Sequence, residues 1–144
     1  MYQDAISMSV VVVYIIPIIC YLYTFDSTHL HAFMGVIATM GLSEFIKYFI
    51  VKDKSIRPKG ARNCNSLCND GTCSGAPGMP SSHSAIVAFF AVFYINHTTN
   101  KYVHILLIIY ALLVMLSRYL KRCHTIYQIG AGSVLGGLLG ASLN

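Results

Sequence analysis

Residues 78–95 read GMPSSHSAIVAFFAVFYI, and this stretch joins a polar turn to a long apolar run. A proline, two serines and a histidine stand side by side in the turn, and the run that follows carries no charged residue. A histidine at the mouth of such a run is either an anchor at a membrane interface or part of a functional site. The rest of the chain has to decide between the two.

Composition indicates a membrane protein. The 144 residues are 56% hydrophobic and 10% charged, with a mean hydropathy of +0.62, whereas soluble domains contain about 25% charged residues. Apolar runs of near-spanning length recur, and a bilayer core of about 30 Å requires roughly 20 residues. The first run, 6–24, lacks a basic flank and a small-residue cleavage site, so we treat it as a span of the mature protein. We expect one domain over residues 1–144.

Five spans are expected, and the need to satisfy backbone hydrogen bonds in lipid makes them helices of an all-α bundle. They cover residues 6–24, 29–51, 83–97, 102–118 and 124–142, and the Gly-, Ser-, Asn- and Lys-rich segment 52–82 is a polar loop. Because successive spans reverse direction, the loop 52–82 and the turn 118–124 lie on the side of the N-terminus. Four groups of matching chemistry therefore emerge on one face, namely Arg57, His83, Arg118 and His124.

The last span contains Gly132, Gly136 and Gly140 at intervals of four residues. Small residues at this spacing let helices pack closely in lipid. We expect this face inside the bundle, and a seam of a homodimer is the alternative.

Three of the five cysteines, Cys64, Cys68 and Cys73, share the polar loop, whereas Cys20 and Cys123 are isolated in the sequence. The loop spacing is not that of the usual zinc sites. A disulfide in an oxidising compartment and free thiols both remain open, and we expect Cys20 and Cys123 to be inert.

The groups on this face suit phosphoryl transfer. Two arginines and a lysine can clamp a phosphate, with Ser81 and the free N–H groups at the start of the span at 83 as further donors. One histidine can attack phosphorus while the other protonates the leaving oxygen. The face has few carboxylates that could hold a metal, so we expect no metal and no other cofactor. No nucleic-acid partner is expected.

These residues also form motifs. Pro80-Ser81-Ser82-His83, then Ser117-Arg118 followed at the family spacing by His124, and Arg57-Pro58 all resemble the type 2 phosphatidic acid phosphatase family of membrane lipid phosphatases. The family motifs are K-x6-RP, PSGH and SR-x5-H-x3-D, and the match runs over residues 44–142. The family core usually has six spans. The stretch GMPSSHS, with Gln128 in place of the final Asp, most resembles the dolichyl diphosphatase branch.

The resemblance implies a role for each residue. His124 corresponds to the nucleophile that becomes phosphohistidine, and His83 to the general acid. Arg57 and Arg118 correspond to the phosphate clamps. Ser81 corresponds to the hydroxyl donor, and Ser82 takes the glycine position, where a backbone N–H would face phosphate.

The first departure from the family pattern concerns the lysine, because Ile50 stands where the family motif has it. Lys47 and Lys52 are the nearest candidates. Lys47 lies within a span, where a lysine is costly and therefore a functional candidate. It takes the role if the linker is longer here, whereas the alternative is that it only pairs with Glu44.

The second departure is Gln128. The family Asp orients the nucleophilic histidine and stabilises its positive form. A Gln carbonyl can still accept the ring N–H, but it cannot supply the charge. In a Ser-His-Asp site, replacing the Asp by Asn costs about 10⁴ in kcat.

The leading interpretation is hydrolysis of a lipid phosphate or diphosphate, with a polyprenyl diphosphate as the substrate. A catalytically weak relative that binds anionic lipid or scaffolds other proteins is the alternative. A vanadate-dependent haloperoxidase shares the pocket but is not a membrane bundle, and a structural or channel-forming protein leaves the motif register unexplained. The Lys and Arg count places the site in the cytoplasm, whereas the resemblance and the loop cysteines favour a lumenal site in an endoplasmic reticulum-like membrane.

Overall fold

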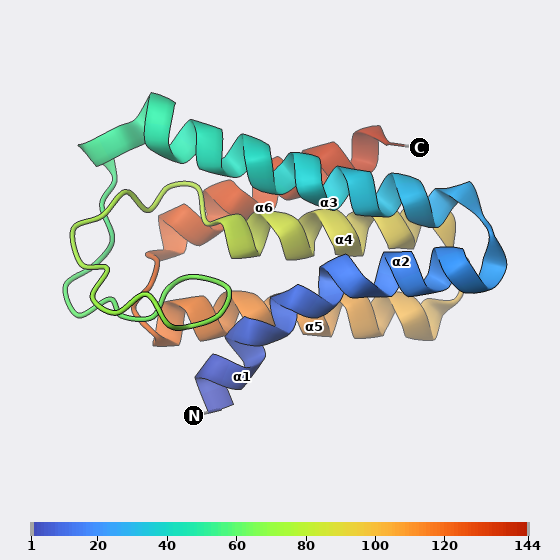
Figure 1. Cartoon of the computed structure of the whole chain (residues 1–144), viewed down its shortest axis with the longest axis horizontal. Coiled ribbons are helices and arrows are strands. Elements are labelled where there is room, and N and C mark those ends of the chain that lie inside the picture. Colours follow the sequence, from blue (N-terminus) through green and yellow to red (C-terminus); the bar gives the residue numbers. More distant parts are fainter. Residues whose placement is uncertain (1, 144) are drawn as a thin grey trace.

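The computed structural model describes residues 2–143, and all of its regular elements are helical (Figure 1). The first rod consists of α1, a short 3-10 turn and α2. The second is α3, which continues through a π-helical stretch and a 3-10 turn. The bounds are α1 Tyr2–Met8, η1 Ser9–Val11, α2 Val12–Thr24, α3 Ser27–Phe45, η2 Ile46–Val51, η3 Lys52–Lys54, α4 Ser82–His97, α5 Lys101–Leu120 and α6 Ile126–Ser142.

The five rods agree with the five expected spans to within a few residues. Three of them are long and apolar enough to cross a membrane, and these are Tyr2–Thr24, Ser27–Lys54 and Lys101–Leu120. Large apolar side chains on their outer faces are exposed, among them Ile19, Leu22 and Leu112. Exposed apolar surface on this scale indicates contact with lipid. The chain is an integral membrane protein with an all-α fold.

The remaining two helices, α4 and α6, have 16 and 17 residues, which is shorter than a full span. α4 lies at the centre of the bundle, and most of its side chains are buried, including Phe89 and Phe93. The PSSHS turn therefore leads into the central helix of the fold, which explains why the run that follows it is apolar on every face.

The glycines of α6 pack directly against the backbone of α4. A Cβ atom at Gly136 would lie 1.9 Å from the carbonyl oxygen of Ala85, and one at Gly132 would lie 2.4 Å from the carbonyl oxygen of Ser81. Only glycine permits this approach. The glycine face is thus used inside the bundle, and the alternative of a homodimer seam on this face finds no support.

Capping residues fix where the helices begin. The side chains of Asp26, Ser81, Asn100 and Thr125 accept hydrogen bonds from backbone N–H groups at the starts of α3, α4, α5 and α6. Thr125 and Gln128 form a capping box. The caps of α4 and α6 matter most, because the histidines at 83 and 124 adjoin them.

The polar loop and the α5–α6 turn lie together at one end of the bundle, as the expected sidedness requires (Figure 1). Within the loop, residues 55–57 run antiparallel to residues 76–78, with the N–H of Arg57 donating to Ala76 and the N–H of Gly78 donating to Ser55. This double-stranded stretch gives the loop a fixed shape beneath the end of α4.

Candidate active site

A cavity of about 210 Å³ lies at the loop end of the bundle. Five of the residues predicted to form the site line it, namely Lys47, Arg57, Ser82, His83 and His124. The other wall residues are Met40, Glu44, Tyr48, Cys64, Asn65, Ser66, Asp70 and Ile86. Four separate segments of the chain thus converge on one small polar space. Ser81, Arg118 and Gln128 do not line it.

His124 is held in one tautomer by the backbone. Its Nδ1 lies 2.9 Å from the carbonyl oxygen of Gly78, and because a carbonyl can only accept, Nδ1 must carry the proton. In the neutral ring the lone pair is then on Nε2. The residue is 2% exposed, so the orientation of its ring is fixed by packing as well as by this hydrogen bond.

Gln128 does not contact the ring of His124, which corrects the expected role of this residue. Its Nε2 donates to the carbonyl oxygen of Ile56 at 2.9 Å and to the hydroxyl of Ser55 at 3.1 Å. Its Oε1 accepts from the N–H of Thr125. Gln128 therefore reaches His124 through the loop, because it holds residues 55–56, which in turn bind Gly78.

His83 and Arg57 each present an unused polar atom. Nε2 of His83 and one terminal nitrogen of Arg57 are buried and have no hydrogen-bond partner among the described residues. The Nε of Arg57 contacts the carbonyl oxygen of Pro77 at 3.4 Å, which anchors the side chain. Buried polar atoms without partners are rare in folded proteins, and here two of them belong to residues that line the same cavity.

The two serines have different positions from those expected. Ser81 is fully buried as the N-cap of α4, where its hydroxyl accepts from Ser84. Ser82 lines the cavity with its side chain and is bonded to Lys47 and Glu44. The hydroxyl within the cavity is therefore that of Ser82.

Lys47 lies in the cavity, whereas Lys52 is exposed in the 3-10 turn beyond it. The ammonium group of Lys47 donates to Ser82 Oγ at 2.7 Å and forms an ion pair with Glu44. Its side chain is 3% exposed. Lys47 thus pairs with Glu44 and also lines the cavity, and its role in a phosphate clamp stays a prediction.

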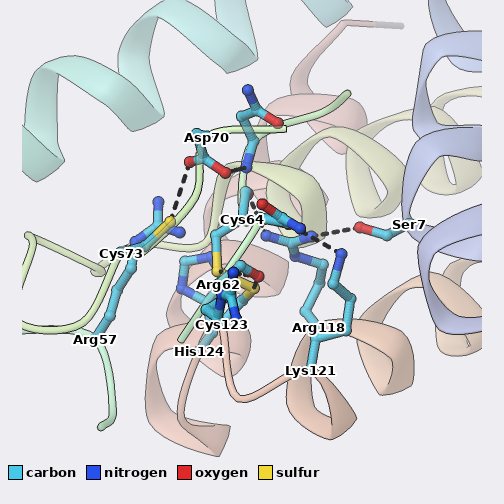
Figure 2. The surroundings of a disulfide bond; sticks show 12 residues. Ser7, Arg57, Arg62, Cys64, Asp70, Cys73, Arg118, Lys121, Cys123 and His124 are labelled. Carbon is cyan, nitrogen blue, oxygen red and sulfur yellow. Dashed lines mark hydrogen bonds between the residues drawn. A yellow bond between two sulfur atoms is a disulfide. The ribbon is translucent and has the colours of Figure 1, made fainter. Parts of the chain in front are cut away.

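Arg118 lies behind the cavity wall and is completely buried. Its two terminal nitrogens donate to the hydroxyl of Ser7 and to the carbonyl oxygen of Cys64 (Figure 2). Its Nε has no partner among the described residues. In this arrangement Arg118 ties α1 and the loop to the end of α5, and its charge acts on the site from behind.

A disulfide joins Cys64 to Cys123, next to His124 (Figure 2). The sequence position of Cys123 had indicated an isolated, inert cysteine, and the disulfide shows that this expectation was wrong. The bond links the loop to the turn that carries His124, and its cysteines are 59 positions apart in the sequence. Cys20, Cys68 and Cys73 are free.

The free cysteines of the loop form no metal site. Within residues 2–143, no three His, Cys, Asp or Glu side chains lie close enough together to hold a metal ion. The thiol of Cys73 contacts Asp70 at 3.2 Å, and burial together with this hydrogen bond raises the pKa of Cys73. A thiol kept protonated is a poor nucleophile.

The fold and the cavity define a membrane-embedded helical bundle with a histidine- and cation-lined site at one membrane face. The family model described as PAP2 superfamily matches residues 28–143, and the chain belongs to this superfamily. Membership implies phosphatase-type hydrolysis of a lipid phosphate. Comparison with curated proteins gave no match, and comparison with solved structures gave none either.

Proposed function

We propose that the protein hydrolyses a polyprenyl diphosphate of the dolichyl type, through a phosphohistidine on His124 and without a metal. The observation that carries this proposal is the set of unpaired polar atoms on residues around the 210 Å³ cavity, from Arg57 and His83. A pocket of this size is smaller than the 300–1,000 Å³ of typical ligand sites. It suits a phosphoryl group better than a hydrocarbon chain.

In the proposed reaction, Nε2 of His124 attacks phosphorus while Nδ1 keeps its proton on the carbonyl of Gly78. The bond from phosphorus to the bridging oxygen breaks as His83 gives that oxygen a proton. Water then attacks phosphorus as His83 takes a proton from it, and the bond from phosphorus to Nε2 of His124 breaks. Inorganic phosphate leaves, and His124 and His83 return to their starting states.

Cations stabilise the charge on the phosphoryl oxygens during both steps. Arg57 and Lys47 both line the cavity, and one buried terminal nitrogen of Arg57 has no hydrogen-bond partner among the described residues. Arg118 adds positive charge from behind the wall. Fixed donors in a site without bulk water supply more stabilisation than the same groups in water.

The apolar part of the cavity supports a substrate with an isoprenoid chain. Met40, Tyr48 and Ile86 are among the residues that line the cavity, and Met40 and Tyr48 are also exposed. A chain in the bilayer could pass between α3 and α4 along these residues. The phosphoryl group then stays at the membrane face, where the loop residues lie.

The test is turnover of dolichyl diphosphate against phosphatidic acid by purified protein in the same detergent. We expect the diphosphate to have the higher kcat/KM, and release of phosphate from neither lipid would refute the proposal. His83→Ala is the matched variant for the acid step. It should lower turnover strongly and should lower it least for a substrate whose leaving group needs no proton.

A catalytically weak relative that binds anionic lipid is the second candidate. The observation in its favour is that the terminal nitrogens of Arg118 and the ammonium of Lys47 already have protein partners. Binding of phosphatidic acid vesicles without turnover of any lipid phosphate would support this candidate over the first.

We also propose that the site faces the lumen of an endoplasmic reticulum-like membrane. The Cys64–Cys123 disulfide lies at the site end of the bundle, and disulfides persist in oxidising compartments. The Lys and Arg count, which favours the opposite orientation, includes residues that serve the site or the fold. Lys47, Arg57 and Arg118 are among them.

Two reporter cysteines at opposite ends test this orientation. Lys59 and Thr99 are both exposed, and they lie in the loop at the site end and in the α4–α5 turn. In sealed microsomes, an impermeant maleimide should label Thr99→Cys at once and Lys59→Cys only after the membrane is opened. The reverse order would place the site in the cytoplasm.

A further inference from the structure

A carboxylate stands inside the cavity proposed to bind an anion. Glu44 lines the same space as Arg57, His83 and His124, and about a third of its side chain, 35%, is exposed. One of its oxygens, Oε1, accepts hydrogen bonds from both Lys47 Nζ and Ser82 Oγ. Neither the phosphatase motifs nor the proposed reaction has a role for this residue.

Carboxylate and phosphate oxygens are acceptors of the same kind. Lys47 and Ser82 are the donors that a phosphoryl group entering the cavity would meet. Glu44 accepts the one O–H of Ser82 and one of the three N–H groups of Lys47, and a second N–H of Lys47 is directed to Ser82. A bound phosphate must therefore compete with Glu44 for these donors. It must also lie near a like charge in a partly desolvated space, where repulsion is several times stronger than in water.

We propose that Glu44 weakens the hold of the site on free inorganic phosphate and so speeds release of this product. This inference rests on the proposed function and deepens it. After the phosphohistidine is hydrolysed, Glu44 takes back Lys47 and Ser82 and the phosphate leaves. A lipid substrate is retained in spite of the same competition, because its chain remains held in the bilayer and free phosphate has no such anchor.

The geometry also makes Glu44 a positioning residue. Its i,i+3 pairing with Lys47 keeps the ammonium group directed toward Ser82 at the start of α4. Glu44→Gln keeps an acceptor oxygen of the same reach and removes only the charge. This variant separates the effect of competition from the effect of holding Lys47 in place.

The experiment measures binding of orthophosphate and orthovanadate to purified protein by calorimetry and by the shift in melting temperature, which needs no turnover. We expect Glu44→Gln to bind both about tenfold more tightly than the wild type, because a repelling charge is gone. In steady-state assays, phosphate should inhibit the variant more strongly, and both KM and kcat should fall. A residue with a merely structural role would not give tighter binding when removed.

Asp53→Asn is the matched control. It removes the same charge from an exposed position outside the cavity, so its affinity for phosphate should stay within a factor of about two, as screening of exposed charges predicts. Lys47→Met should weaken binding, since it removes a donor and leaves Glu44 without its ion-pair partner.

Unchanged or weaker phosphate binding by Glu44→Gln would overturn the inference, and hydrolysis of a lipid phosphate by the wild type would then leave the proposed function standing. If the wild type neither binds orthophosphate or orthovanadate nor hydrolyses any lipid phosphate, the proposed function fails and this inference fails with it.

Discussion

Replacing Gln128 by Glu exchanges one amide nitrogen for an oxygen and leaves the shape of the side chain almost unchanged. The two possible roles of Gln128 predict opposite results. If Gln128 accepted the ring N–H of His124 directly, a carboxylate would add a charge that stabilises the positive ring, and activity would rise. In the structure, the amide nitrogen instead donates to Ile56 and Ser55, so the variant loses donors and activity should fall.

The expected size of the effect comes from these contacts. The carbonyl of Ile56 loses its 2.9 Å hydrogen bond, and a residue that is 1% exposed gains a charge facing backbone oxygens. A buried acceptor left without a donor costs about 1–3 kcal/mol. If this cost displaces residues 55–56, it also displaces Gly78, whose N–H binds Ser55 and whose carbonyl holds His124.

We therefore expect Gln128→Glu to lower kcat/KM about 10- to 100-fold, since each factor of ten corresponds to about 1.4 kcal/mol. The melting temperature should fall as well. The assay is phosphate release from dolichyl diphosphate in detergent, with thermal unfolding of the same preparations. Ser55→Ala is the control, because it removes one hydroxyl and keeps both carbonyls, and it should change activity by less than about threefold.

A higher kcat for Gln128→Glu at an unchanged melting temperature would refute the reasoning. It would mean that residue 128 acts on the ring of His124 itself during the reaction. A loss of kcat/KM equal to that of Ser55→Ala would refute it too, because the hydrogen bond from Gln128 to the backbone carbonyl would then contribute nothing to activity.

Three further predictions concern the nucleophile, the clamp and the packing. His124→Ala should abolish turnover, and the purified variant should keep its melting temperature. Vanadate should inhibit the wild type, whereas EDTA should not. Near wild-type turnover by the variant, or strong inhibition of the wild type by EDTA, contradicts the mechanism. Lys47→Met should lower kcat/KM at least about tenfold and Lys52→Met less than about twofold, because only the first lies in the cavity; the reverse ranking moves the clamp to Lys52. Gly136→Ala should destabilise the fold by about 1–3 kcal/mol through its contact with the α4 backbone, whereas Gly130→Ala, which meets no atom within 4 Å, should be neutral or slightly stabilising; equal melting temperatures for the two would contradict the packing described here.

The sequence predicted the fold well because the physics of spanning segments depends on composition and length. Backbone groups in lipid must bond within their own helix, so apolar runs are enough to locate the rods. The boundaries at 25–28 and 98–101 were also predictable, because capping side chains such as Asp26 and Asn100 mark where helices begin.

The sequence could place residues on one face but could not say which atoms meet there. Ser81 and Ser82 are adjacent and chemically identical, and only the N-cap geometry of α4 decides that Ser82 faces the cavity. The acceptor for His124 is a backbone carbonyl, that of Gly78. Every residue has a backbone carbonyl, so no side-chain motif in the sequence could predict this contact.

The disulfide illustrates a second limit. Cys64 and Cys123 are 59 residues apart, and the sequence alone left open whether the three loop cysteines form a disulfide or remain free thiols. The bridge depends on how the loop folds back onto the α5–α6 turn, which is a long-range property of the fold. The spacing of the cysteines in the sequence suggests only pairings between cysteines that are close together in the chain.

The exchange of Asp for Gln at position 128 has a consequence for how charge is distributed in the site. A carbonyl behind His124 stabilises a positive ring less than a carboxylate would, and the ring becomes positive when Nε2 bonds to phosphorus. In this chain the negative charge lies instead on Glu44, beside Lys47. The transition state then depends more heavily on the cations that face the phosphoryl oxygens. For that reason we expect loss of Lys47 to be at least as damaging as loss of the Gln128 contacts, although the hydrogen bonds of Lys47 among the described residues go to Glu44 and Ser82 and not to a histidine.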